Sequence, residues 1–249
     1  MTEKQRLLYA LDPVGFAAEC LGIVPDAVQA RVLDPMVRRG ILNCSRQWGK
    51  STITAAMAVH RAYFSGDSLV VVVSASERQS AEFLRKARVF ARMLGVPMGR
   101  PGMHSVTLLF ENGSRMVALP STEDTIRGFS APSLLILDEA SRMSDQLYMS
   151  LRPMLATGDG CLWLVSTPNG KWGFFHDQWH AGGDLWTRIS VKATECGRIS
   201  AAFLAEERGQ MTDAMFRQEY LCEFTEAEDA FFSEESVRRS VTDGIEPLF

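Results

Sequence analysis

Ile41-Leu42-Asn43-Cys44-Ser45-Arg46-Gln47-Trp48-Gly49-Lys50-Ser51-Thr52 decides the fold that we expect for this chain. The stretch begins as a short apolar strand, continues as a tight loop and opens an amphipathic helix. A loop that closes onto a helix N-terminus points backbone N–H groups and the positive end of the helix dipole at one spot, which suits a phosphate. Lys50 adds a charge that reaches the β- and γ-phosphates of a nucleotide, and the Ser51 hydroxyl is placed to bind Mg²⁺.

The match to the phosphate-loop pattern G-x-x-x-x-G-K-[ST] is partial, because Cys44 stands where the first glycine is usual. The alternative is an ordinary helix start with a Ser or Thr cap. If the loop does hold a nucleotide, the residues that bind it are Ser45, Arg46, Gln47, Trp48, Gly49, Lys50, Ser51 and Thr52.

A second stretch, Ser133-Leu134-Leu135-Ile136-Leu137-Asp138-Glu139, is a continuous apolar run that ends in two carboxylates. Such a run is typical of a strand buried on both faces of a parallel sheet, and ligands of open α/β sheets bind beyond the carboxyl ends of the strands. We therefore expect Asp138 beside the phosphate loop as an Mg²⁺ ligand, and Glu139 as the group that polarises the attacking water. The alternative is that the acidic pair merely starts a helix over residues 140–143.

Length and composition limit the classes of fold and partner to consider. The chain has 249 residues, a net charge of −4 and 22% charged residues, so one α/β domain with at most a small appendage is expected and no global basic field indicates nucleic acid. The five cysteines are scattered and odd in number, which argues for reduced thiols in a cytosolic setting and against a zinc site. No signal peptide and no run of ~20 apolar residues is present, so we expect no membrane partner.

Strand and helix patterns alternate along the rest of the chain. An Asn-Gly pair between apolar runs predicts a hairpin over residues 106–119. Further strands are predicted at 69–74, 161–166 and 186–191, and helices at 77–94, 145–156, 200–210 and 213–223. The predicted fold is α/β: a P-loop NTPase of the ASCE or RecA-like type, with a doubly wound, mostly parallel sheet and helices on both faces. We divide it into a helical lead (1–40), a core (41–225) and an acidic linker or tail (226–249).

Four motifs in this order resemble those of the large terminase subunit, the DNA-packaging motor of tailed bacteriophages. They are Ser45-Arg46-Gln47-x-Gly49-Lys50-Ser51-Thr52, Thr125-Ile126-Arg127-Gly128 ahead of the acidic strand, Ser166-Thr167-Pro168-Asn169-Gly170, and Phe216-Arg217-Gln218-Glu219-Tyr220-Leu221-Cys222-Glu223-Phe224. The resemblance covers roughly residues 25–225. It implies an ATPase that uses ATP and Mg²⁺ to move double-stranded DNA into a procapsid.

The resemblance also implies roles for individual residues. Arg46 would reach the γ-phosphate, Thr167 and Asn169 would sense it and pass strain to the closing helices, and Gln29 would contact adenine. Arg127 matches the position of an arginine finger supplied to a neighbouring subunit, a contact worth ~10³–10⁵ in rate. Each has a plainer alternative, in which Arg46, Gln29 or Arg127 is an ordinary solvated residue.

Partners follow from the same resemblance. A homo-oligomeric ring, as a pentamer on the capsid portal protein, is implied, together with a terminase small subunit and the cytoplasm of an infected bacterial host as the location; the isolated chain could be monomeric. Family members carry a second, metal-dependent nuclease domain. Too few residues follow Phe224 to fold one, so we expect the ATPase half of a longer protein, without nuclease activity; a naturally short homologue is the alternative.

Helix 77–94 carries Arg85, Arg88 and Arg92 at spacings that place them on one face, and Arg100 follows in the next turn. A motor that moves duplex of any sequence needs phosphate contacts and no base reading, which this group fits. A ring would sum weak contacts from several acidic monomers. A solvated helix face is the alternative.

Two other functional classes remain at this point. A helicase-like or remodelling ATPase would need arginine-bearing motifs in a second RecA-like domain, for which the chain has no room. A nucleotide-binding switch or scaffold without turnover is the other, and Lys50, Asp138 and Glu139 argue against it.

Overall fold

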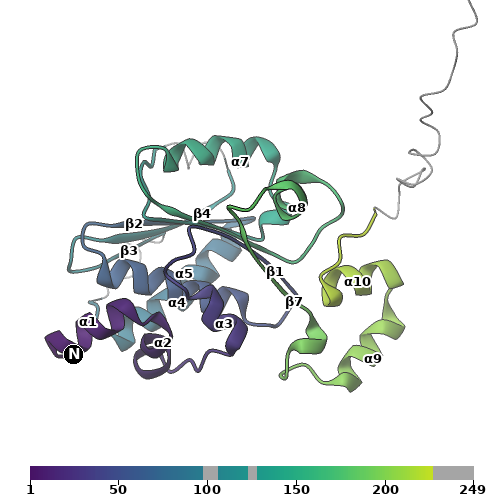
Figure 1. Ribbon diagram of the computed structural model, residues 1–249, viewed down its shortest axis with the longest axis horizontal. Coiled ribbons are helices and arrows are strands. Elements are labelled where there is room, and N and C mark those ends of the chain that lie inside the picture. The colour runs from purple at the N-terminus through teal and green to yellow at the C-terminus, as the bar shows by residue number, and fades with distance from the viewer. Residues whose placement is uncertain (98–105, 123–127, 227–249) are drawn as a thin grey trace, which may run out of the picture.

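The computed structural model describes residues 1–97, 106–122 and 128–226, which form a seven-stranded sheet between layers of helices (Figure 1). The strands lie in the order β3-β4-β2-β5-β6-β1-β7. Their bounds are β1 Arg39–Cys44, β2 Leu69–Ser74, β3 Thr107–Leu109, β4 Arg115–Pro120, β5 Leu134–Asp138, β6 Cys161–Ser166 and β7 Thr187–Val191.

Every strand pair is parallel except β3–β4, which is the hairpin predicted around Asn112-Gly113. In the hairpin turn the Phe110 N–H donates to the Ser114 carbonyl at 2.9 Å. Because the other strands run the same way, the carboxyl ends of β1, β5 and β6 meet at one edge of the sheet. The predicted fold class is confirmed.

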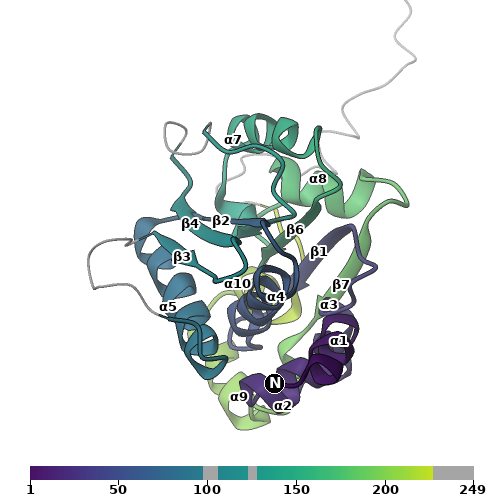
Figure 2. The ribbon, with the colours of Figure 1, turned by 90° about the vertical axis from the view of Figure 1, so that its left-hand side faces the viewer.

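Helices cover both faces of the sheet, as the alternating pattern predicted. Their bounds are α1 Glu3–Leu11, α2 Pro13–Leu21, α3 Ala27–Val32, α4 Lys50–Phe64, α5 Glu77–Met93, α7 Asp145–Leu151, α8 Gly173–Ala181, α9 Ala201–Gln210 and α10 Asp213–Leu221. In Figure 1, α7 and α8 lie above the sheet and α3, α4 and α5 below it, while α9 and α10 extend past β7. Figure 2 shows α4 between α5 and the N-terminal helices, with which it is in contact.

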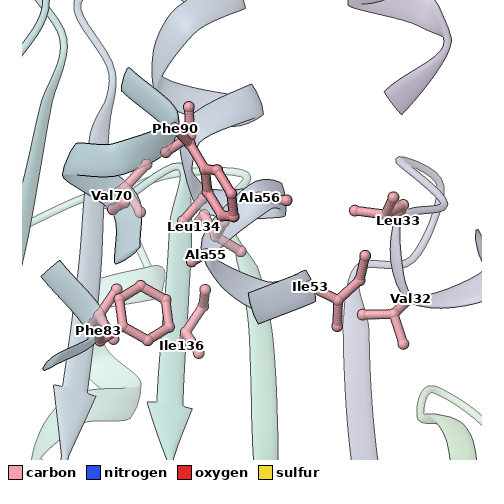
Figure 3. Close-up of a cluster of buried hydrophobic side chains, with 14 of the residues drawn as sticks. Val32, Leu33, Ile53, Ala55, Ala56, Val70, Phe83, Phe90, Leu134 and Ile136 are labelled. Atoms are coloured by element: carbon pink, nitrogen blue, oxygen red, sulfur yellow. The ribbon is translucent and has the colours of Figure 1, made fainter. Parts of the chain in front are cut away.

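Alternate residues of each central strand enter different cores. Val70 and Val72 of β2 pack against α4 and α5, together with Phe83, Leu134 and Ile136 (Figure 3). The intervening residues Leu69, Val71 and Val73 face α7 and α8. A strand buried on both faces loses its alternation of apolar and polar residues, which is why the valine run reads as continuous.

The N-terminal helices belong to the first core, because Tyr9, Phe16 and Val32 are all part of it. A third, smaller cluster joins α9 and α10 to the end of β7 through Ala193, Leu204, Phe216 and Tyr220. The division into lead, core and tail stays a prediction. No helix within the described residues has the length and hydropathy of a membrane span.

Two local predictions were wrong. The helix expected over 145–156 ends at Leu151, and a 3-10 helix, η2 (Arg152–Leu155), follows because Pro153 has no N–H to continue the α-helical pattern. Helix α8 was not expected. It is rich in aromatic residues and His, lacks a side-chain N-cap and follows Trp172, so it carries few of the usual start signals.

Candidate functional site

The loop between β1 and α4 closes directly onto the helix. Gln47 and Gly49 both have left-handed backbone angles, with φ of 64° and 100°. Gly49 is the N-cap of α4, and no side chain caps this end. The alternative of a Ser or Thr cap is therefore wrong: Ser51 and Thr52 lie inside the helix, and no side chain of the described residues competes with an anion at this helix start.

Lys50 and Glu139 meet across the carboxyl ends of β1 and β5. The Lys50 Nζ lies 2.8 Å from Glu139 Oε1, and the two side chains are only 12% and 18% exposed. Lys50 Nζ also donates to Thr167 Oγ1 at 3.3 Å, and the Thr167 hydroxyl donates to the Cys44 carbonyl at 3.2 Å. The structure thus brings the loop, the acidic pair and the segment after β6 to one point.

Glu139 sits in a left-handed conformation (φ 61°, ψ 44°) as the N-cap residue of the 3-10 helix η1 (Ala140–Arg142), and its side chain makes no capping hydrogen bond. A short helix does follow the acidic pair, as the alternative stated, but the Glu139 carboxylate is directed to Lys50 and not to the helix start. Ser166 Oγ lies 3.4 Å from Glu139 Oε2 and 2.8 Å from Ser141 Oγ. Asn169 Nδ2 lies 3.5 Å from the Ser141 carbonyl, so the segment after β6 contacts the backbone that follows Glu139.

Asp138 is 5% exposed, and its Oδ1 atom has no hydrogen-bond partner among the described residues. Burial raises the pKa of Asp138 to about 6, and the neighbouring charge of Glu139 contributes to the rise. An unpaired buried carboxylate oxygen is costly unless something binds it. Asp138, with the half-buried Ser51 on the first turn of α4, offers the oxygen ligands that a hard cation such as Mg²⁺ prefers.

Arg46 does not point to the Lys50–Glu139 pair in this structure. Its Nε donates to Glu219 Oε2 of α10 at 2.5 Å, and Arg142 Nη2 lies 3.8 Å from the other oxygen of the same carboxylate. This ion pair and hydrogen bond raise the pKa of Arg46. The adjacent Gln218 accepts a hydrogen bond from the Gly170 N–H at 3.0 Å. Helix α10 therefore contacts two loops of the site at consecutive residues.

Gln29 is 5% exposed, so the alternative of a solvated helix residue is wrong. Its Oε1 accepts from the Asp26 N–H at 3.1 Å in a capping box, and its Nε2 lies 3.5 Å from the Trp48 carbonyl of the loop. Trp48 itself is buried, with 1% exposure, so its side chain anchors the loop in the core.

Arg85, Arg88 and Arg92 all lie on α5 (Glu77–Met93). Arg85 is paired with Glu82 at 2.7 Å, Arg88 Nη2 lies 3.5 Å from the Thr107 carbonyl, and Arg92 is exposed. Arg100 and Arg127 lie outside the described residues. Two residues with no predicted role, Glu219 and Arg198, contact the loop; Glu219 was part of a quoted motif, whereas no sequence signal pointed to Arg198.

A match to a protein-family model identifies the family of this chain. The model of the terminase large subunit, T4likevirus-type, N-terminal region matches residues 41–239. The chain belongs to this family. The match spans the loop, the acidic strand and α10, so the resemblance stated from four motifs is confirmed.

Individual terminases are similar along most of this chain. The probable large terminase subunit of Enterobacteria phage P7 is 24% identical over 235 residues, which is 87% of this chain and 46% of the relative; the chain thus spans about half of that terminase. The large terminase ATPase domain of Thermus phage P74-26 superposes with a TM-score of 0.74 at 20% identity, covering 86% of this chain and all of that domain. The large terminase of a thermophilic bacteriophage, in complex with ADP, gives 0.65 at 13% identity over 80% of this chain and 53% of its own. At these low sequence identities, the structural similarity between this chain and the two terminases shows that they share a fold.

Proposed function

We propose that this chain is the ATP-hydrolysing motor domain of a viral terminase large subunit, which translocates double-stranded DNA into a procapsid. The contact between Lys50 and Glu139 carries the proposal, because it joins the phosphate loop to the acidic strand at 2.8 Å in a member of the terminase family. A terminase of the same fold has been crystallised with ADP, which supports an adenine nucleotide as the ligand.

The phosphate loop, Lys50 and Gln29 each have a defined task in nucleotide binding. The loop from Ser45 to Thr52 surrounds the phosphates, with backbone N–H groups at the uncapped start of α4 as donors. Lys50 turns from Glu139 to the β- and γ-phosphates. Gln29 contacts the adenine edge from beside the loop, where its amide lies 3.5 Å from the Trp48 carbonyl.

Asp138 and Ser51 would hold Mg²⁺. The unpaired, buried Oδ1 of Asp138 is the observation that fits a cation there. Bound Mg²⁺ would neutralise charge on the transferring phosphoryl group. Glu139, once Lys50 has left it, has a free carboxylate that orients and polarises the attacking water.

Thr167 and Asn169 are proposed to sense the γ-phosphate. Thr167 touches Lys50, and Asn169 lies against the η1 backbone that follows Glu139, so both report on the state of the two catalytic groups. The same segment bonds to Gln218 of α10 through the Gly170 N–H. Movement of the segment is thereby passed to the closing helix.

The remaining partners are proposed from family membership. The ring, as a pentamer, assembles on the portal protein with a terminase small subunit, in the cytoplasm of the infected host. Arg127 acts as an arginine finger toward a neighbouring subunit and contributes to catalysis. Arg85, Arg88, Arg92 and Arg100 form a phosphate-contacting face for duplex DNA.

The proposal is tested by ATP hydrolysis and nucleotide binding on the purified protein. Lys50→Ala should remove both, because it deletes the phosphate-binding charge. Arg127→Ala should abolish hydrolysis in the assembled ring and leave the Kd for ATP within about twofold of the wild type, since a finger acts on a neighbour. Absence of ATP binding by the wild-type protein would overturn the proposal, and loss of binding in Arg127→Ala would overturn the finger role.

A further inference from the structure

Arg198 reaches the phosphate loop from a distant part of the chain. Its Nη2 donates a hydrogen bond to the Trp48 carbonyl. A Cβ placed on Gly49 would lie 3.4 Å from this Nη2 and 3.5 Å from Gln29 Nε2. Arg198 and Gln29 therefore approach the same point of the loop, where both lie against the Trp48 carbonyl.

The fold holds Arg198 in this position. Strand β7 pairs with β1 in parallel. The N–H of Ser45, the first residue after β1, donates to the carbonyl of Val191, the last residue of β7, at 3.0 Å, so β7 ends beside the loop. The chain then turns through the 3-10 helix η3 (Ala193–Glu195), with Ala193 and Cys196 buried. The Ile199 N–H bonds to the Cys196 carbonyl at 2.9 Å, which closes a tight turn around Arg198.

The surroundings of Arg198 suit an aromatic ligand. No carboxylate of the described residues forms an ion pair with it, and its side chain is exposed. A guanidinium is planar, weakly hydrated and stacks well on π-systems. Its present acceptor, the Trp48 carbonyl, is shared with Gln29, whose Nε2 lies 3.5 Å from the same oxygen.

We propose that Arg198 forms the second wall of the nucleobase site, stacking its guanidinium on the face of a purine whose edge Gln29 contacts. This rests on the proposed function, since it requires a nucleoside triphosphate in the loop. The ligand class is a purine nucleoside triphosphate, and Arg198 acts on the base and not on the phosphates.

The test combines substitution of Arg198 with removal of the base. Calorimetric titration gives Kd values for ATP and for ribose 5-triphosphate, which lacks the base, with the wild-type chain and with Arg198→Ala and Arg198→Lys. Both variants should bind ATP about tenfold more weakly and ribose 5-triphosphate within twofold of the wild type, because lysine keeps the charge and loses the planar stack. Arg208→Ala, an exposed arginine of α9 paired with Asp213, is the matched control and should change neither.

Equal weakening of both ligands by the two variants would show that Arg198 serves the phosphates or the loop itself, and would overturn the proposal. So would unchanged ATP binding, or a wild-type protein that binds both ligands with one Kd. These outcomes leave the ATPase proposal intact, whereas a wild-type protein that binds neither ligand overturns both. Thermal melts within a few degrees of the wild type establish that each variant is folded.

Discussion

The ammonium group of Lys50 lies 2.8 Å from the carboxylate of Glu139, with both side chains largely buried. Two groups proposed for different tasks, phosphate binding and water activation, thus neutralise each other before a nucleotide arrives. A partly buried pair of this kind is held together more strongly than a surface ion pair, because solvent screens it less. Phosphate entry has to exchange one anion for another at Lys50.

Glu139→Gln should therefore separate binding from turnover. The neutral amide competes less for Lys50 and repels the γ-phosphate less, so the Kd for ATP should stay equal to the wild-type value or fall by up to about tenfold. Hydrolysis should fall by about 10²–10⁴, the usual contribution of a general base. Single-turnover hydrolysis and calorimetry measure the two effects, with Glu3→Gln on the exposed face of α1 as control. Retention of turnover would exclude Glu139 as the catalytic carboxylate.

Glu219→Gln should strengthen nucleotide binding through Arg46. Arg46 Nε lies 2.5 Å from Glu219 Oε2, so the guanidinium is paired with α10. Weakening this pair lets Arg46 reach the γ-phosphate more often, so we expect a several-fold lower Kd for ATP, absent when Arg46→Gln is combined with it. Glu223→Gln, which breaks a comparable pair with Arg217, is the matched control. An unchanged or higher Kd would mean that Glu219 does not restrain Arg46.

Arg88→Glu with Arg92→Glu should weaken binding to duplex DNA of any sequence. Each lost phosphate contact should lower the slope of log Kobs against log salt by about 0.9, so the pair should lower it by up to about 2. Arg88 also approaches the Thr107 carbonyl, so Arg92→Glu alone provides a variant that leaves this contact intact. Arg208→Glu with Arg217→Glu on α9 and α10 is the control. An identical slope for variant and wild type would remove α5 from the DNA face.

His60 should make the fold sensitive to mild acid. Burial lowers the pKa of His60 below its ordinary value of 6.5, and its Nε2 lies 2.8 Å from the Tyr9 carbonyl, to which the neutral ring can donate. The unfolded chain therefore takes up the proton first: the stabilising contribution is present above pH 6.5 and is lost as pH falls below it. His60→Gln should cost about 1 kcal/mol at pH 7.5 and lose less stability at pH 5.5 than the wild type, by urea unfolding. If the wild type and His60→Gln lost the same stability between pH 7.5 and pH 5.5, His60 would be excluded as the source of the acid sensitivity.

The strands and the loop were predictable because their signals are local. The valine run of β2, the apolar run before Asp138 and the Gly49-Lys50-Ser51 sequence each carry their information within a few residues. Parallel pairing then follows from general rules for α/β sheets, which is why the phosphate loop and the acidic pair were expected to meet although 89 positions separate Lys50 from Glu139 in numbering.

The contacts that hold the site were not predictable in the same way. Glu219 reaches Arg46 across 173 positions, and Arg198 reaches Trp48 across 150. Neither has a periodic pattern or a neighbouring motif that selects its partner. The packing of α10 beyond β7 brings Glu219 to Arg46, and the turn after η3 brings Arg198 to Trp48. The early end of α7 had a local signal, Pro153, which a continuous helical pattern outweighed in the prediction.

Helix α10 holds on to two loops with adjacent side chains, Gln218 to Gly170 and Glu219 to Arg46. Neighbouring side chains on a helix point about 100° apart, so neither of these two side chains can make the other's hydrogen bond. If α10 moves during the proposed ATPase cycle, both hydrogen bonds have to break before the helix is released. The displacement of the closing helix would then be cooperative, an all-or-none step rather than a graded one.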